Sequence, residues 1–181
     1  MAYITESQLK NYASRQRYKS FSHVKTASSQ AKLTVFLSHS HCQEDEEHVE
    51  GLIAFFETLG ISVYVDWNDK QMPRITSRAT AAQIKKRIKD LSIFMVLATK
   101  NALASKWVPW EIGIADQIKG EDQVMIIPVA DDYGQFHGSE YLQLYQRAEI
   151  ATDGTYAVFE PNMTTGGILL ESQMKKFAGI Q

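Results

Sequence analysis

The chain has 181 residues, of which 44% are hydrophobic and 22% charged, a balance typical of one globular domain long enough to bury a core. A formal net charge of −2 disfavours a nucleic-acid binder, which usually presents a strongly basic face. The single cysteine excludes an intramolecular disulfide framework, and no apolar run approaches the roughly 18 residues that span a bilayer. The N-terminus has no basic and then apolar leader, so we expect a cytoplasmic protein with no membrane or nucleic-acid partner.

The N-terminal residues differ in charge from the rest of the chain. Residues 1–32 carry six basic residues and one acidic residue, whereas the remainder is acidic on balance. The sequence TESQ at residues 5–8 is a capping box and predicts a short helix through about Arg17. We expect residues 1–31 to form a basic arm with a mobile linker after this helix, and residues 32–181 to form the domain. The arm is either a solvated leader, which we favour, or a segment that docks onto a partner or onto the domain itself.

From residue 33 onward, β-rich runs alternate with helical patterns, as in βαβ units. Two of the runs are apolar without alternation, as strands covered on both faces must be. The sequence therefore predicts a doubly wound, flavodoxin-like α/β fold around a parallel sheet. The five predicted strands are residues 33–37, 61–65, 92–98, 124–129 and 156–159.

Helical periodicity fills most of the intervals between these strands. Apolar residues recur at helical spacing from Val49 to Leu59. Gly60 follows at the position where helices commonly end in a left-handed backbone conformation. The same spacing predicts three further helices, over residues 84–91, from about Pro109, and over residues 170–177.

A polar loop follows the first predicted strand, where the carboxyl ends of parallel strands bind ligands. It contains Ser38, His39 and Ser40, next to the free N–H groups of the following helix. Neither glycine-rich phosphate motif occurs in the chain, which disfavours a Rossmann dehydrogenase and a P-loop enzyme. His39, His41, Cys42 and His48 are zinc-type ligands by chemistry but not by spacing, so we predict no metal site.

A long connection follows the second predicted strand, and long loops at this edge of a sheet are often functional. Asp66 either pins the loop or contacts a ligand, and Trp67 could serve as a lid or a stacking surface. Arg74 and Arg78 either face a pyrophosphate or remain solvated, the second being the more common case.

Glu111 stands close to the start of the helix predicted from Pro109. A glutamate there is either a favourable charge at the helix N-terminus or a catalytic group. Two indoles, Trp107 and Trp110, flank it, and an apolar wall strengthens the electric field that a carboxylate exerts.

Three blocks together resemble a TIR (Toll/interleukin-1 receptor) domain over residues 32–160. They are VFLSHS at residues 35–40, GISVYVD at residues 60–66 and SKWVPWE at residues 105–111. The third block, with a Trp four residues before a Glu, is similar to the subset of TIR domains that consume NAD+. The resemblance implies a five-stranded parallel sheet of order 2-1-3-4-5.

For that subset the resemblance also implies cleavage of the nicotinamide–ribose bond of NAD+, with NAD+ as substrate and no cofactor. Glu111 is then the catalytic residue. Nicotinamide departs as a neutral molecule, so one carboxylate that stabilises the oxocarbenium-like centre suffices. Water as the attacking group gives ADP-ribose, and a group of the same molecule gives a cyclic isomer. The substrate-binding residues implied are Ser38, His39, Ser40, Asp66, Trp67, Arg74 and Trp107. The acidic residue that often follows the Ser-His-Ser block is displaced here, so which of Ser38, His39, Ser40 and Asp45 touches ligand stays open.

Stand-alone TIR proteins of this size are similar to those of bacterial anti-phage systems such as Thoeris, whose product signals to a nucleotide-sensing effector. Residues 67–77 correspond to the loop that builds head-to-tail TIR assemblies, so the resemblance implies a homo-oligomer. Two alternatives remain: a non-enzymatic TIR adaptor that acts by self-association, and a nucleoside deoxyribosyltransferase-like enzyme whose glutamate is a nucleophile.

Overall fold

The structure is a computed structural model, and it describes residues 2–20, 33–59, 61–65 and 77–179. The expected linker after the first helix lies outside the described residues. Among the helices of these ranges, none is long and apolar enough to cross a membrane.

The sheet confirms the doubly wound α/β class and corrects one strand. Its order is β3-β2-β4-β5-β6-β7-β8, parallel from β3 to β6 and antiparallel beyond, with β1 paired to β5. The five parallel strands thus follow the expected order 2-1-3-4-5, but the fifth is β6 and not residues 156–159, which form the antiparallel β7. The strands are β1 Ile4–Thr5, β2 Thr34–Ser38, β3 Ser62–Tyr64, β4 Ile93–Ala98, β5 Val124–Ala130, β6 Gln146–Ile150, β7 Tyr156–Phe159 and β8 Ile168–Leu169.

Strand β6 was missed because its sequence, QRAEI, is polar. Its buried Gln146 is satisfied by partners far along the chain, and its buried Glu149 by a neighbour in the same strand. Gln146 donates to the Asp122 carbonyl at 2.6 Å and accepts from Gln173 at 3.1 Å, while Glu149 accepts from the guanidinium of Arg147. Buried polar groups with such partners cost little, and periodicity alone gives no sign of them.

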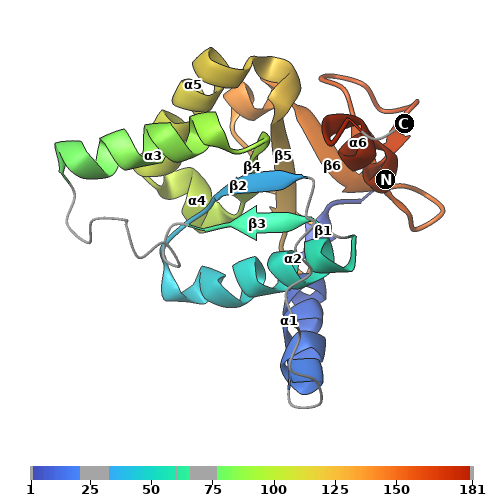
Figure 1. Ribbon diagram of the computed structural model, residues 1–181. Coiled ribbons are helices and arrows are strands. Elements are labelled where there is room, and N and C mark those ends of the chain that lie inside the picture. The colour runs from blue at the N-terminus through green and yellow to red at the C-terminus, as the bar shows by residue number, and fades with distance from the viewer. Residues whose placement is uncertain (1, 21–32, 60, 66–76, 180–181) are drawn as a thin grey trace.

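Helices cover both faces of the sheet (Figure 1). Helices α3 and α5 lie on one side, and α2 with α1 on the other. Each face has its own apolar cluster, one built on Val35, Leu37 and Met95 and the other on Phe36, Phe94 and Val96. Strand β4 is buried throughout, which explains its unbroken apolar run. The helices are α1 Glu6–Ser20, α2 Glu46–Thr58, α3 Arg78–Asp90, α4 Lys100–Ala104, α5 Trp107–Lys119 and α6 Leu170–Phe177, with short 3-10 helices η1 Gln43–Asp45, η3 Glu121–Gln123 and η4 Glu140–Leu144.

The N-terminal segment docks onto the domain itself, so the preference for a solvated leader was wrong. Strand β1 pairs with the end of β5, and Leu9 of α1 is fully buried. Helix α1 crosses α2 so closely that a Cβ added at Gly51 would lie 2.0 Å from the carbonyl oxygen of Leu9. The capping box is present, because the Thr5 and Gln8 side chains each accept a hydrogen bond from the other's backbone N–H. The division of the chain at residue 31 stays a prediction.

Candidate active site

The candidate site lies where the strand order reverses. Strand β2 is flanked by β3 and β4, which continue the chain in opposite directions across the sheet, and this switch point is where doubly wound folds bind ligands. Ser38 ends β2 and is paired in register with Val96 of β4. Helix α5 begins at Trp107 beyond the end of β4 and carries Glu111 toward Ser38.

Glu111 and Ser38 form a buried pair that joins two distant parts of the chain. Glu111 is 7% exposed, and the Ser38 hydroxyl donates to its Oε2 at 2.5 Å. A short hydrogen bond to a charged acceptor is stronger than one between neutral groups. This bond fixes the orientation of a carboxylate that has been largely removed from water.

The start of α5 argues against a capping role for Glu111. The helix begins at Trp107, so its first turn contains no acidic residue. Ser105 accepts instead, from the backbone N–H of Trp107 at 3.1 Å and of Val108 at 3.5 Å. The sequence placed Glu111 near the helix start because Pro109 suggested a start two residues later than the structure shows. Its catalytic role stays a prediction.

The loop after Ser38 begins with two buried residues and folds back on itself, whereas residues 41–44 are exposed. His39 and Ser40 are 5% and 4% exposed. The Nδ1 of His39 is hydrogen-bonded to the carbonyl of Leu37 at 2.9 Å, and the Ser40 hydroxyl accepts from the N–H of Cys42 at 3.0 Å. Both side chains therefore shape the loop, and their contact with substrate stays a prediction.

Trp107 packs against its neighbouring indole at the start of α5. The rings of Trp107 and Trp110 meet edge to face, with centroids 5.2 Å apart, and both pack against the apolar cluster of this face. Lys85 of α3 places its ammonium 5.7 Å from the centre of the Trp110 ring. The two indoles thus pack against each other, and Trp110 also contacts α3.

Three predicted substrate-binding residues, Asp66, Trp67 and Arg74, lie outside the described residues. Arg78 is exposed at the first position of α3, directly after the capping residue Ser77. The described ranges contain no cluster of three or more His, Cys, Asp or Glu side chains that could hold a metal ion.

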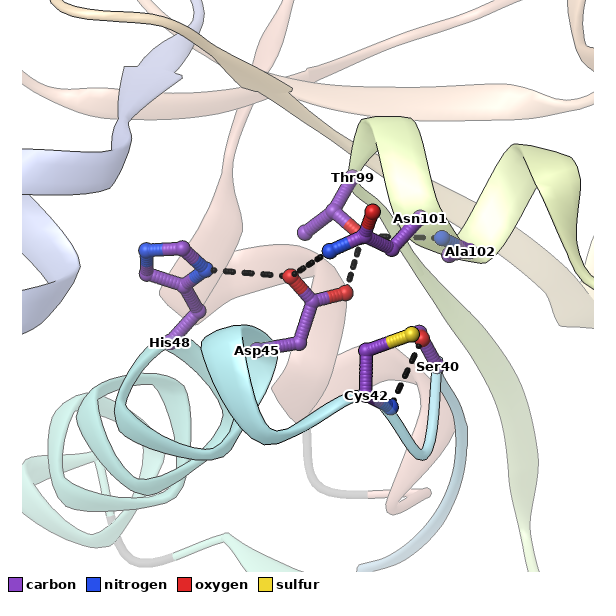
Figure 2. Close-up of polar contacts among 7 residues, drawn as sticks. All are labelled: Ser40, Cys42, Asp45, His48, Thr99, Asn101 and Ala102. Atoms are coloured by element: carbon purple, nitrogen blue, oxygen red, sulfur yellow. Dashed lines mark hydrogen bonds and ion pairs between the residues drawn. The ribbon is translucent and has the colours of Figure 1, made fainter.

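A second polar network lies beside the site (Figure 2), and sequence reasoning did not find it. Asp45 is 2% exposed and accepts from the Thr99 hydroxyl at 2.5 Å and from the Asn101 amide at 3.1 Å. The Nδ1 of His48 lies 3.5 Å from Asp45 Oδ1. Sequence analysis left open whether Asp45 touches ligand, whereas in the structure both of its oxygens face protein donors. No sequence pattern links a carboxylate to a threonine 54 residues away.

Burial raises the pKa of Asp45, but the nearby His48 and the hydrogen bonds from Thr99 and Asn101 outweigh burial and hold that pKa below its usual value. The carboxylate is therefore ionised at neutral pH.

Comparison with known proteins identifies the fold family. The model of the TIR domain family matches residues 35–155. A Bacillus cereus (strain MSX-D12) protein named "Probable 3' cyclic ADP-D-ribose synthase ThsB'" is 36% identical over 149 residues, which cover 79% of this chain and 71% of the relative. A Cytobacillus dafuensis protein named as a candidate cyclic ADP-D-ribose synthase, TIR2, is 30% identical over 114 residues, 54% of this chain and 30% of the relative. The matched region contains the switch point, the Glu111–Ser38 pair and the Asp45 network, and this chain belongs to the TIR domain family.

Proposed function

We propose that this protein cleaves the nicotinamide–ribose bond of NAD+ and that Glu111 is its catalytic residue. The observation that carries the proposal is the buried Glu111 carboxylate, held by the Ser38 hydroxyl at the switch point of the sheet. Two relatives named as cyclic ADP-D-ribose synthases support NAD+ as the substrate.

One carboxylate is sufficient for the bond cleavage. The leaving nicotinamide takes the electron pair of the C–N bond and departs neutral, so no general acid is required. The ribose carbon becomes electron-poor, and a fixed anion nearby stabilises that charge as it develops. A carboxylate has about four lone-pair sites. Glu111 can therefore keep its bond from Ser38 and also accept hydrogen bonds from ribose hydroxyls.

We propose a cyclic ADP-ribose-type molecule as the main product, because the names of both relatives specify such a product. A nucleophile of the same molecule then forms the new bond to the ribose carbon and loses its proton to solvent. Water in its place gives ADP-ribose. A small cyclic nucleotide is suited to signalling, so the proposal extends to a nucleotide-sensing effector in bacterial anti-phage defence and to a homo-oligomer built through TIR contacts.

Incubation of the purified protein with NAD+ tests this proposal. The assay is run over a range of protein concentrations, with and without a crowding agent, and the products are resolved by mass spectrometry. We expect nicotinamide and a product lighter than ADP-ribose by one water. ADP-ribose alone would refute cyclisation and leave the bond cleavage intact. No nicotinamide at any concentration, or in lysate of phage-challenged cells, would favour the non-enzymatic adaptor.

A further inference from the structure

The loop that follows β2 is attached to the segment carrying Glu111 at two points. At its beginning, Ser38 donates to Glu111. At its end, Asp45 accepts from Thr99 and from Asn101 (Figure 2). Residues 38–45 are therefore held at both ends against residues 99–111.

The second attachment point, at Thr99, is connected to Glu111 by a short stretch of chain whose helices are capped. Thr99 directly follows β4 and caps α4, since its hydroxyl accepts from the N–H of Ala102 at 3.0 Å. Helix α4 ends at Ala104, and the next residue, Ser105, accepts from the first two N–H groups of α5. A displacement of Thr99 is thus passed along a stretch with little freedom to the helix that bears Glu111.

Asp45 is suited to hold this attachment and not to bind substrate. Its side chain is buried, the donors of Thr99 and Asn101 reach one oxygen each, and the Nδ1 of His48 lies 3.5 Å from Oδ1. Hydrogen bonds to an ionised acceptor are stronger than those between neutral groups. An amide at this position keeps the volume, but it presents a donor group where the carboxylate presents an acceptor.

We propose that Asp45 is a positioning residue, which, through Thr99 and Asn101, sets the loop of residues 39–44 against the helix that carries Glu111. This inference rests on the proposed function, because its consequence is the alignment of Glu111 with the ribose. A misplacement of about 1 Å in an active site can cost on the order of 100-fold in rate. Asp45 itself touches no reacting atom.

The test uses conservative variants of Thr99 and Asp45, with a matched control at the other end of β4. Thr99→Val removes both the donor to Asp45 and the cap of α4, Thr99→Ser retains both, and Asp45→Asn removes the charge while the cap stays. The control is Ser92→Ala. The hydroxyls of Ser92 and Thr34 lie 3.2 Å apart and link the amino ends of β4 and β2, the strands whose carboxyl ends the Asp45 network joins.

Two readouts are taken below the onset of unfolding: kcat and KM for nicotinamide release, and hydrogen exchange of the backbone amides of residues 39–45. For Thr99→Val and Asp45→Asn we expect kcat to fall by about 10- to 100-fold with KM changed less than about threefold. Exchange in the loop should become at least several-fold faster. Thr99→Ser should recover most of the wild-type kcat, and Ser92→Ala should leave both readouts near wild type.

The outcomes separate this inference from the function on which it rests. If the wild-type protein releases no nicotinamide, the proposed function fails, and hydrogen exchange still decides whether Asp45 holds the loop. Unchanged exchange in Thr99→Val and Asp45→Asn would overturn the positioning role. Faster exchange with a kcat loss no larger than that of Ser92→Ala would overturn it as well.

Discussion

At the scale of single residues, the most informative contact is the one between Ser38 and Glu111. The sequence places Ser38 at the carboxyl end of a strand and Glu111 near the start of a helix that follows another strand, so their proximity could be expected from topology. Their direct hydrogen bond could not, because it depends on the side-chain rotamers and on the start of α5 at Trp107. The sequence suggested Ser38 as a substrate contact, and the structure gives it the additional role of holding the carboxylate.

Ser38→Ala should show how much the Ser38 hydroxyl contributes to turnover. Removal of the hydroxyl leaves Glu111 without this donor, and a hydrogen bond to a charged group contributes about 1.5–3 kcal/mol. We expect kcat/KM for nicotinamide release to fall by about tenfold or more. A value equal to that of the control Ser92→Ala would show that the Ser38 hydroxyl contributes nothing to turnover.

The ionised Asp45 carboxylate should stabilise the folded protein at neutral pH and lose this effect in acid. Hydrogen bonds lower its pKa in the folded state despite its burial, so the folded protein favours the ionised carboxylate. That stabilisation is present above the unfolded pKa, near 3.8, and is lost as the pH falls through the lower folded pKa. We expect wild type to melt well above Asp45→Asn at pH 7, with the gap narrowing below about pH 4. A gap independent of pH would contradict the ionised state.

At the scale of secondary structure elements, apolar spacing in the sequence predicted the elements whose neighbours are simply apolar. It did not predict the elements that depend on specific polar or close backbone contacts. Strands β2, β4 and β5 and helix α2 could be predicted from apolar spacing, because their neighbours need only be apolar. Strand β6 could not, since it is polar and its buried Gln146 is satisfied by Asp122 and Gln173, far away in sequence. The close crossing of α1 over α2 is equally invisible in periodicity, because it depends on the missing side chain of Gly51.

Two glycines on different helices should respond in opposite ways to alanine. A Cβ at Gly51 collides with the backbone of Leu9, and overpacking of this kind costs about 1–3 kcal/mol. A Cβ at Gly113 of α5 meets nothing within 4 Å, and alanine is preferred over glycine in a helix by roughly 0.5–1 kcal/mol. Thermal melting should show a lower Tm for Gly51→Ala and a slightly higher one for Gly113→Ala. Equal Tm values would contradict the close crossing.

At the scale of the whole molecule, the N-terminal segment is part of the domain's core. Strand β1 extends the sheet along the end of β5, Ala2 forms a bridge with Ile150 of β6, and the backbone N–H of Ser7 donates to Asp132 at 3.2 Å. Lys10 and Arg15, two of the basic residues that set this segment apart in sequence, are exposed, whereas Leu9 and Ala13 are buried in the core. Composition describes the surface of a segment and says little of where it docks.

Leu9→Ala should therefore destabilise the whole protein. A fully buried leucine replaced by alanine costs about 2–5 kcal/mol. Calorimetry should show one transition, shifted to lower temperature, while the control Tyr133→Ala, at a residue 92% exposed, should leave it in place. An unshifted main transition would mean that the N-terminal segment unfolds independently of the domain.

The central claim, that the buried Glu111 carboxylate carries out NAD+ cleavage, is tested most directly by Glu111→Gln. The exchange keeps the shape of the side chain, and the Ser38 hydroxyl can still donate to the amide oxygen. Nicotinamide release is measured for both proteins at the same concentration, with Tm as the check on folding. We predict that the variant melts within a few degrees of wild type and that its release falls by at least about 100-fold. A folded Glu111→Gln protein that releases nicotinamide at the wild-type rate would contradict the catalytic role of this carboxylate.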